Sequence, residues 1–411
     1  GGGTVTVTLG PGVAWAAYQD GNGPWQRFSG SSFQVTDSSG RYGFAYVCVI
    51  ERDQVAQVTV TQATVAELRT LGAACEGDTP PPTAYHVTGT VSNVGTGDSR
   101  ATVITVSDFD SGLPDGASFD LFPTVAGVRD LLGLRYPSPG ACPDRILVRR
   151  DLMVNGDVSG QNLDFAGGSG FSPRAFTVSG ATAGRTTFAY QNVLTKNATD
   201  ASVCLISTPT GQWQAVDSGV IAEDLYIFVV FAESGAGGPG EVALKYVSAV
   251  PDPGNQGVTL PAPITGLSAT GRRPLYSGLA YVSTTLPLRA YLLFHRQSQS
   301  RWSILVTPGW LGGASQYQTP DFSAVAGWNT AWEMEAGWQI TWFGRVYLSN
   351  RGLAEQPPRV LAGRQVFSQV RARLAQTGRV LARPVGRAGP ASVQPGTEVQ
   401  WAESGEGRYT P

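Results

Sequence analysis

Hydrophobic and polar residues alternate along most of this chain in short runs separated by turns. Three stretches share one pattern, in which an apolar and aromatic run is followed by a polar turn and a Trp: AWAAYQDGNGPWQRF (14–28), SVCLISTPTGQWQAV (202–216) and RAYLLFHRQSQSRWSIL (289–305). The pattern is typical of a β-hairpin with one buried face. We therefore predict three hairpins with equivalent, mostly buried indoles at Trp25, Trp213 and Trp302.

An aromatic-rich strand is expected downstream of each hairpin. These strands are RYGFAYVCVI (41–50), EDLYIFVVFAE (223–233) and GWQITWFGRVYL (337–348). A pattern that recurs at long, irregular spacing favours repeated β-sandwiches over one barrel or a solenoid. The predicted fold class is all-β, with several tandem immunoglobulin-like or transthyretin-like sandwich modules joined by Pro- and Gly-rich linkers.

Linkers divide the chain into five segments. GDTPPPTA closes the first and VPDPGNQGVTLPAPITG closes the third, and such Pro- and Gly-rich runs are typical of linkers. The predicted segments are 1–82, 84–172, 173–264, a Trp-rich 265–350 and an Arg-rich 351–411. VAELRTLGAA in the first segment predicts a short helix. QVFSQVRARLAQ in the last fits a helix or a strand, because periodicity alone does not separate the two.

The second segment resembles a known family. GTVSN, a Val-rich strand and SFDLFPTVAGVRDLLGLRY follow one another over residues 87–136. This order is similar to the carboxypeptidase-regulatory-like (transthyretin-like) β-sandwich of bacterial surface proteins. The resemblance implies an extracellular spacer or binding module without shared catalytic residues. The long DFDSGLPDGA stretch departs from the family, which has a short turn there.

Charge and cysteine content limit which cellular compartments and which classes of partner fit the sequence. Charged residues make up 15% of the chain and the net charge is −2, so there is no basic field for nucleic acid. No apolar run is long enough to span a bilayer as a helix. The four cysteines predict disulfides in an oxidising compartment, with buried thiols as the alternative. The favoured pairs are Cys48–Cys75 and Cys142–Cys204.

The first residues predict an assembly element. GGG precedes a clean alternation over Thr4, Val5, Thr6, Val7, Thr8 and Leu9, which is a half-buried strand. This strand either completes its own module or is donated to a neighbouring copy, because an unpaired edge accepts a strand readily. A Gly run at the start is also common after the lipidated Cys of bacterial lipoproteins, so a lipid anchor is an alternative interpretation of the same residues.

Residue types that carry catalysis are scarce. The two histidines, His86 and His295, lie in different segments, and no GxSxG motif marks a nucleophile. Glu333 and Glu335 in WEMEAGW would share one face of a strand, as a glycosidase pair requires. An ordinary acidic face opposite Trp332 is the alternative. We expect no enzyme, with a hydrolase as the remaining catalytic hypothesis.

Two binding sites are expected from side-chain type. Asp108, Asp110 and Asp115 have the spacing of a calcium loop, although the terminal Glu of an EF-hand is missing and Asp is also a common turn residue. No other cofactor has candidate ligands. Indole faces stack on sugars, so the Trp-rich segment offers a glycan site at Trp328, Trp332 and Trp338. Coplanar exposed rings would favour glycan binding, and buried rings would favour structure.

The function expected from these features is structural. We expect an extracytoplasmic protein of the bacterial cell surface or outer envelope, with or without a lipid anchor, that assembles with copies of itself or with other surface proteins. The alternative is a surface lipoprotein that binds a glycan or the cell wall. The Arg-rich stretch 359–387 could contact an acidic surface or lipid headgroups, or be a solvated contact between modules.

Overall fold

The computed structural model describes residues 1–50, 55–75, 83–106, 108–197, 199–234, 239–249, 253–355 and 394–411. Within these ranges the chain is all-β, as predicted, and its one α-helix is the single turn α1 (Pro308–Leu311). Three short 3-10 turns, η1 (Phe165–Gly167), η2 (Thr330–Trp332) and η3 (Leu353–Glu355), complete the helical content there. The Arg-rich stretch 359–387, including QVFSQVRARLAQ, lies outside the described residues.

The first unit sets a strand plan that recurs along the chain. Its strands are β1 (Gly3–Leu9), β2 (Val13–Asp20), β3 (Gln26–Arg27), β4 (Ser32–Val35), β5 (Arg41–Ile50), β6 (Val55–Thr64) and β7 (Thr70–Ala73). A small sheet has the order β4-β1-β7, and a larger one has the order β3-β2-β5-β6. The first and last strands of the unit, β1 and β7, pair in parallel, and β1 pairs antiparallel with β4.

Units two and three repeat this plan. Unit two consists of β8 (Ala84–Ser92), β9 (Arg100–Ile104), β10 (Phe109–Leu113), β11 (Ser118–Val125), β12 (Gly127–Tyr136), β13 (Arg145–Val154) and β14 (Leu163–Asp164). Unit three consists of β15 (Phe171–Ser179), β16 (Thr186–Leu194), β17 (Asp200–Ile206), β18 (Thr210–Val216), β19 (Leu225–Glu233), β20 (Gly240–Ser248) and β21 (Gln256–Thr259). Their small sheets are β11-β8-β14 and β18-β15-β21, and their larger ones are β10-β9-β12-β13 and β17-β16-β19-β20. In both units the first and last strands pair in parallel, as in unit one.

Unit four repeats the order of the larger sheet, but its small sheet differs, because its first strand lies at the edge and its pairs are all antiparallel. Its strands are β22 (Ser268–Thr270), β23 (Leu275–Ser277), β24 (Leu288–Arg296), β25 (Ser300–Val306), β26 (Gln316–Gln318), β27 (Ile340–Ser349), β28 (Glu398–Glu403) and β29 (Gly407–Tyr409). The small sheet is β22-β23-β26, and the larger one runs β25-β24-β27-β28, with β29 also on β27. The predicted segment 351–411 thus supplies two strands, β28 and β29, to unit four.

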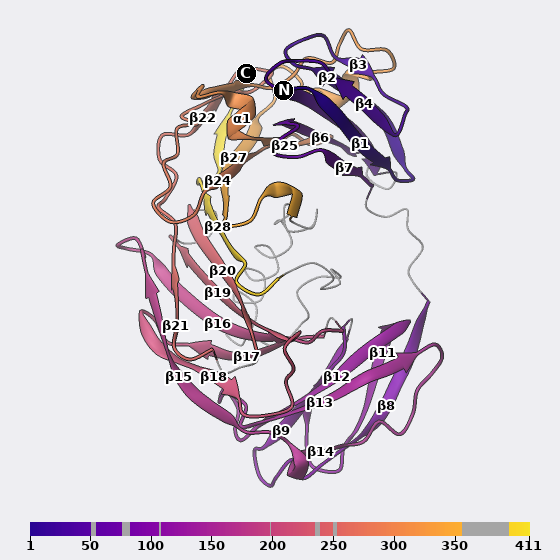
Figure 1. The fold of residues 1–411 in the computed structure, drawn as a ribbon, viewed down its shortest axis with the longest axis vertical. Helices are drawn as coiled ribbons and strands as arrows, with labels where there is room; N and C mark the ends of the chain where they lie inside the picture. The colour runs from indigo at the N-terminus through magenta and orange to yellow at the C-terminus, as the bar shows by residue number, and fades with distance from the viewer. Residues whose placement is uncertain are drawn as a thin grey trace.

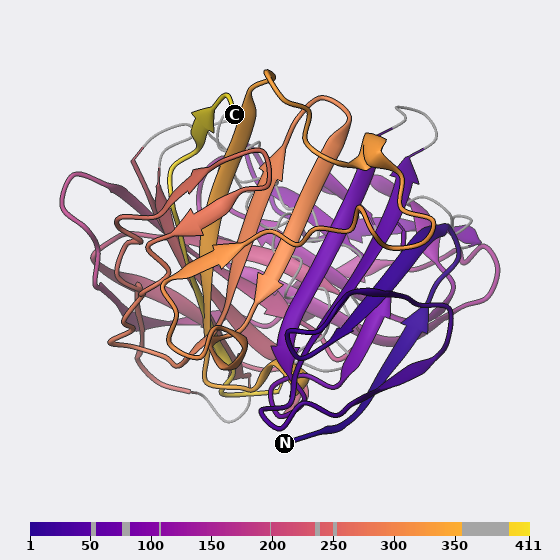
Figure 2. The same ribbon diagram turned by 90° about the horizontal axis from the view of Figure 1, so that it is seen from above.

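The larger sheets of units three, four and one join into a single 13-stranded sheet. Strand β28 lies between β27 and β20 and pairs with both. Strand β25 pairs in parallel with β6, so that Trp302 lies opposite Val58. The four units follow one another around an oval, and the long strands of units one and four stand side by side (Figures 1 and 2). Three units are therefore joined by backbone hydrogen bonds as well as by the chain itself.

The structure forms two of the three predicted hairpins. Strands β2 and β3 pair, and so do β24 and β25. The middle prediction is wrong, because β17 and β18 lie in opposite sheets of unit three, where β17 pairs with β16 instead. Trp213 on β18 points into the core, with its ring 4.8 Å from that of Tyr226. Alternation of apolar and polar residues indicates that one face of a strand is buried. The same alternation occurs whether the next strand pairs with it in a hairpin or crosses to the opposite sheet.

The three tryptophans predicted to be equivalent differ in how far they are buried. Trp213 is fully buried and Trp302 is 5% exposed, whereas Trp25 is half-buried beside the short strand β3. The short helix predicted from VAELRTLGAA is also wrong: the segment turns and ends as strand β7. Leu68, Leu71 and Ala73 reach the core of unit one from this segment, so packing overrides its helix propensity.

The predicted assembly strand is the central strand of its own unit. β1 pairs with β4 on one side and with β7 on the other. Val5 and Val7 are buried in the core, while Thr4, Thr6 and Thr8 are exposed. The half-buried character predicted for the strand matches this alternation, and in this chain the strand completes its own sheet.

The structure forms both favoured disulfides. Cys48 on β5 bonds Cys75, with Cα atoms 5.5 Å apart, inside unit one. Cys142, before β13, bonds Cys204 on β17, with Cα atoms 5.1 Å apart, and links units two and three. Two disulfides are typical of an oxidising, extracytoplasmic compartment. Among the described residues, no helix combines the length and the apolar character that a membrane crossing requires.

Candidate functional site

Two tryptophans of unit four, Trp328 and Trp332, lie where this unit meets unit one. The connection between β26 and β27 carries Phe322, Trp328 and Trp332 over β2 of unit one. There the Trp15 ring lies 5.2 Å from Phe322 and 4.9 Å from Trp328, and its indole N–H donates to the Ala326 carbonyl at 3.2 Å. We call this group of aromatic rings the aromatic seam. It closes the contact between two units that are far apart in sequence.

Ring orientation within the aromatic seam differs from that of a sugar-stacking surface. Trp328 meets Trp332 at 84° and Trp15 at 66°, so neighbouring rings stand edge to face. Edge-to-face pairs are the favoured packing of aromatic side chains in cores and interfaces. Trp338 is separate and 63% exposed, and its carbonyl accepts a hydrogen bond from Gln297. The three candidate glycan residues therefore do not form one coplanar open face.

The predicted carboxylate pair is not arranged as a strand would place it. WEMEAGW begins in the turn η2 and continues without regular structure, so Glu333 and Glu335 do not share a strand face. The Glu333 carboxylate pairs with Arg272 at 2.9 Å and accepts from the Trp328 indole N–H at 3.1 Å. Glu335 is exposed. Turn capping by Asn329 explains why the strand prediction is wrong here.

A half-open pocket borders the aromatic seam. Aromatic walls are provided by Trp302, Phe322 and Trp328, and His295 lies among them. The rest of the lining is Arg272, Arg273, Pro274, Thr319, Pro320, Asp321, Glu333 and Met334. The rings of His295 and Trp302 stack 5.5 Å apart, and Trp302 stacks in turn on Phe322 at 5.7 Å. The wall of the pocket is therefore mainly apolar.

His295 is buried and keeps one ring nitrogen without a partner. It is 2% exposed, and its Nδ1 lies 2.9 Å from the Tyr276 hydroxyl. Its Nε2 has no hydrogen-bond partner among the described residues. Burial lowers the pKa of His295 to about 3, so the imidazole is neutral at ordinary pH. A neutral imidazole can donate or accept one further hydrogen bond at Nε2.

The other histidine lies on the surface of unit two. His86 on β8 places Nδ1 2.8 Å from the Asp120 carboxylate of β11, and its ring stacks on Phe122 at 4.4 Å. The hydrogen bond from His86 to Asp120 raises the pKa of His86. The two histidines belong to different units, so the fold does not combine them in one site.

The predicted calcium ligands are spread along a strand. Asp108 precedes β10, Asp110 lies within it and Asp115 follows it. Asp108 accepts from the Phe122 backbone N–H at 2.8 Å, and Asp115 accepts from that of Val94 at 2.9 Å. In the part of the chain that the structure describes, no three acidic, His or Cys side chains form a metal cluster. The stretch predicted as a loop is an edge strand, which separates its carboxylates.

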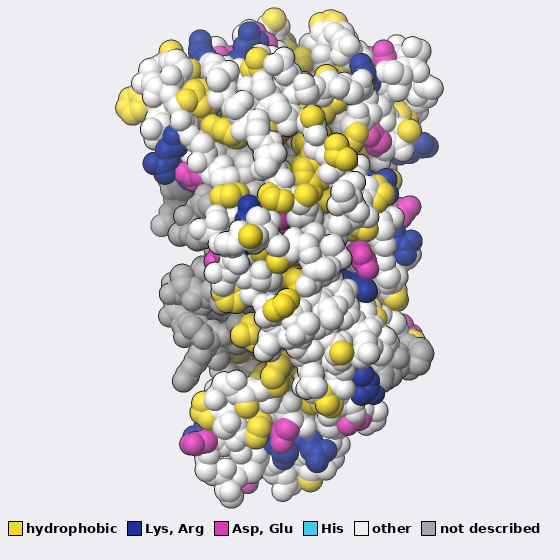
Figure 3. Space-filling view, turned by 90° about the vertical axis from the view of Figure 1, so that its left-hand side faces the viewer, with side chains coloured by type: hydrophobic (Ala, Val, Ile, Leu, Met, Phe, Trp, Pro, Cys, Tyr) yellow, Lys and Arg dark blue, Asp and Glu magenta, His cyan; other side chains and the backbone are white. Residues whose placement is uncertain are grey.

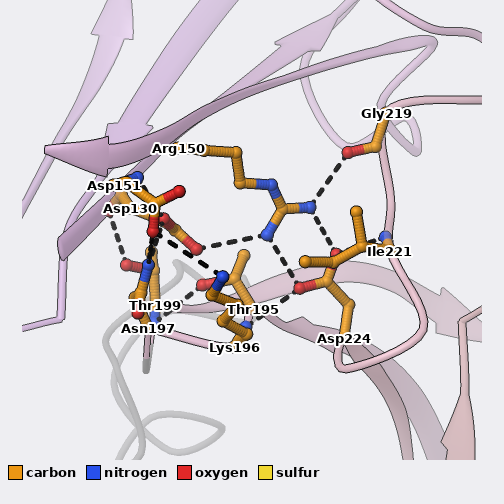
Figure 4. Close-up of polar contacts among 10 residues, drawn as sticks. All are labelled: Asp130, Arg150, Asp151, Thr195, Lys196, Asn197, Thr199, Gly219, Ile221 and Asp224. Carbon is orange, nitrogen blue, oxygen red and sulfur yellow. Dashed lines mark hydrogen bonds and ion pairs between the residues drawn. The ribbon is translucent and has the colours of Figure 1, made fainter. Parts of the chain in front are cut away.

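A buried ion cluster joins units two and three (Figure 4). Arg150 on β13 lies between Asp130 of β12 and Asp224, which precedes β19. Its Nη1 donates to Asp130 at 3.2 Å and to Asp224 at 2.8 Å, and its Nη2 also donates to Asp224. Both carboxylates have no exposed side-chain surface, whereas Arg150 is 20% exposed. One guanidinium thus connects two units through two buried charges.

Further donors complete the ion cluster. Asp130 also accepts from Asn197 at 2.8 Å and from the Asp151 backbone N–H at 3.0 Å. Burial by itself would raise the pKa of Asp130, but these hydrogen bonds, one from Thr195 and the charge of Arg150 outweigh it, so the pKa is lowered. The Asp130 carboxylate is therefore charged and well supplied with donors at neutral pH, whereas Arg150 Nε is buried without a hydrogen-bond partner among the described residues.

Sequence reasoning missed the ion cluster entirely. Arg150 stands in the strand RILVRRDLMV beside Arg149, and nothing in the sequence distinguishes the two. The partner Asp224 is distant in sequence, and only the assembled fold brings it close. A charge directly before the apolar run LYIFVVF was the one available signal.

Comparison with known proteins gives no relative for this chain. No protein-family model matches it, and no curated protein matches it.

Proposed function

We propose that this protein is a structural component of the bacterial cell surface or outer envelope, a rigid scaffold that assembles with copies of itself. The observation that carries the proposal is the way the units are joined. Units three, four and one share one sheet, and a disulfide and the ion cluster fasten unit two to unit three. Interfaces between independent domains are usually smaller and more mobile.

The repeated strand plan supports extending the transthyretin-like resemblance from residues 87–136 to the other units. Units one, two and three place their strands in one small and one larger sheet in the same order, and unit four shares the order of the larger sheet. We propose that each is a transthyretin-like sandwich, although the resemblance in sequence covers only residues 87–136.

Charges of both signs are scattered over the face in Figure 3, as on an ordinary protein surface.

Assembly by strand exchange is the route that we favour. β1 is central in its small sheet, so the same strand taken from a neighbouring copy would make the same hydrogen bonds.

The test uses the full chain and a variant without residues 1–9. The full chain is expected to form ordered polymers on the cell surface and in concentrated solution, seen by electron microscopy. The shortened chain should lose polymers and the fold of unit one, and a GTVTVTL peptide should restore that fold. A peptide with Lys in place of Val5 and Val7 is the matched control. A full chain that stays monomeric at every concentration and forms no ordered material on cells would contradict the proposal.

The alternative functions of the sequence analysis have less support. Trp328 and Trp332 are not coplanar, so they do not form a flat surface for a glycan. A hydrolase at Glu333 would need a second carboxylate, and the other carboxylate among the residues lining the pocket is Asp321, which is paired with Arg273. We propose no catalytic activity.

A further inference from the structure

Strand β28 holds units three and four together. It pairs with β20 of unit three from Gly240 to Lys245 and with β27 of unit four from Arg345 to Ser349, antiparallel on both sides. In the part of the chain that the structure describes, no other strand connects the sheets of these two units directly. We call the space between β20 and β27, which β28 fills, the strand slot.

The strand slot has one positive residue near each end, and β28 has a glutamate for each. Lys245 Nζ on β20 lies 3.6 Å from the Glu398 carboxylate, at the start of β28. Arg345 on β27 pairs with Glu403, at the end of β28, and both of these side chains are mostly buried. Charges that are matched at both ends select the strand and fix its register.

The middle of β28 contacts both units through its side chains. The buried Gln400 donates from Nε2 to the Thr259 carbonyl of unit three at 2.8 Å and accepts from the Thr285 hydroxyl of unit four. Trp401 lies on the opposite face of the strand, with its ring 5.9 Å from that of Tyr347 on β27. The strand slot therefore recognises this particular sequence on both faces of the sheet.

The connection that leads to β28 is longer than a hairpin requires. Asn350, directly after β27, donates to the Gly396 carbonyl at 2.7 Å and accepts from the Glu398 N–H at 3.0 Å. A turn of a few residues would therefore join β27 to β28 within one chain. The sequence instead places residues 356–393 before this strand, and a chain of that length can span on the order of 100 Å.

We propose that the strand slot is a binding site for an extended strand of a second copy, so that residues 394–411 of one copy join units three and four of the next. A second copy fits as the partner because its β28 makes the same ladder bonds, ion pairs and Gln400 contacts as the chain's own strand. The inference rests on the proposed self-assembly, but it concerns a different strand from β1 and does not need β1 to exchange.

Disulfide trapping between copies of the full chain tests the proposal. Val346 and Ala402 are directly opposite in the ladder between β27 and β28, at a separation that a disulfide can bridge. One copy carries V346C, a second copy with a different tag carries A402C, and the two are expressed together. Exchange of β28 brings the two new cysteines side by side, so we expect a covalent dimer that contains both tags and separates on reduction.

Two additions make the trap independent of one pair of positions. L244C and V399C form a second pair, across β20 instead of β27. Each pair is also placed in a single chain, where a bond within the chain shows that the positions can be joined when β28 fills its own slot. If neither pair bonds within one chain or between chains, β28 does not occupy the strand slot and the proposal fails.

Charge reversal on the donated strand tests how the strand slot selects its partner. E398K/E403K in the copy that carries A402C should lower the yield of the mixed dimer by about tenfold or more, because both matched pairs become repulsive. E355K changes an exposed glutamate outside the strand slot and should leave the yield unchanged. If the double reversal does not fold, E398K on the donor should lower the yield and K245E on the acceptor should restore it.

The outcomes separate this inference from the scaffold function. Ordered polymers without a mixed dimer at either pair of positions would refute exchange of β28 and leave the scaffold function in place. A mixed dimer without ordered polymers would support exchange of β28 and contradict the scaffold function. Chains that stay monomeric throughout would refute both.

Discussion

Replacement of Arg150 by methionine tests how units two and three are held together. The guanidinium is the shared partner of Asp130 and Asp224, whose side chains are fully buried. Removal of one partner from a buried ion pair usually costs about 3–5 kcal/mol, because the remaining charge is left without compensation. Each carboxylate keeps backbone or amide donors, so we expect one such penalty in R150M rather than two.

Hydrogen exchange at the ion cluster measures this penalty. The backbone N–H groups of Lys196 and Ile221 each donate to Asp224 at 2.9 Å, so they report directly on the ion cluster. A loss of about 3–5 kcal/mol corresponds to exchange that is faster by about two to three and a half orders of magnitude. The disulfide Cys142–Cys204 stays in place and keeps the two units tethered during the measurement.

Two further variants make the result specific. R149M removes the neighbouring arginine, whose contact is a 3.4 Å hydrogen bond to the Asn162 carbonyl, and should leave exchange unchanged. R150K keeps a positive charge between the two carboxylates and should recover part of the protection, since the buried carboxylates are then still compensated. Exchange in R150M within about threefold of the natural chain would refute the reasoning, because that is under 1 kcal/mol.

Three other outcomes are expected. The pKa of Asp130 lies below its ordinary 3.8, so the carboxylate's contribution to stability is complete above that pH and is lost as the pH falls further. Acid denaturation followed by circular dichroism should show this loss in the natural chain and not in D130N. The pKa of His86 lies above 6.5, so the contribution of the His86–Asp120 pair to stability is present below that pH and is lost as the pH rises through the raised pKa. D120N should move the NMR titration of His86 back toward 6.5. An unchanged titration would exclude Asp120 as the cause. Trp213→Ala should lose about 3–5 kcal/mol of unfolding free energy in denaturant, and a loss under 1 kcal/mol would contradict its fully buried position.

Local patterns predicted many strands well. RYGFAYVCVI coincides with β5, and EDLYIFVVFAE contains β19. Residues of β19 are buried on both faces of the sheet, which explains why the run is apolar throughout instead of alternating. These predictions succeeded because a strand's own residues record how its two faces are buried.

Neighbour relations between strands could not be predicted in the same way. The alternation in β18 is the same whether the strand pairs with β17 or crosses to the opposite sheet. The insertion of β28 between β20 and β27 depends on contacts with strands far away in sequence. Trp328 could be recognised as an aromatic packing residue, but its partner Trp15 belongs to another unit. Pairing is a property of the assembled fold, so one strand's sequence does not contain it.

The ends of the 13-stranded sheet limit how copies can associate. Long unpaired edges invite further strands, and natural proteins shorten or cover them. At one end β3 has only two residues, and at the other the disulfide of Cys204 fastens unit two beside β17. The β3 end therefore offers no long edge to a second copy. In the small sheet of unit one, the edge strands β4 and β7 have four residues each, whereas the central β1 has seven. Exchange of β1 between copies would replace the hydrogen bonds that β1 makes with β4 and β7 by the same bonds to a neighbouring copy, so it links copies without needing an open edge.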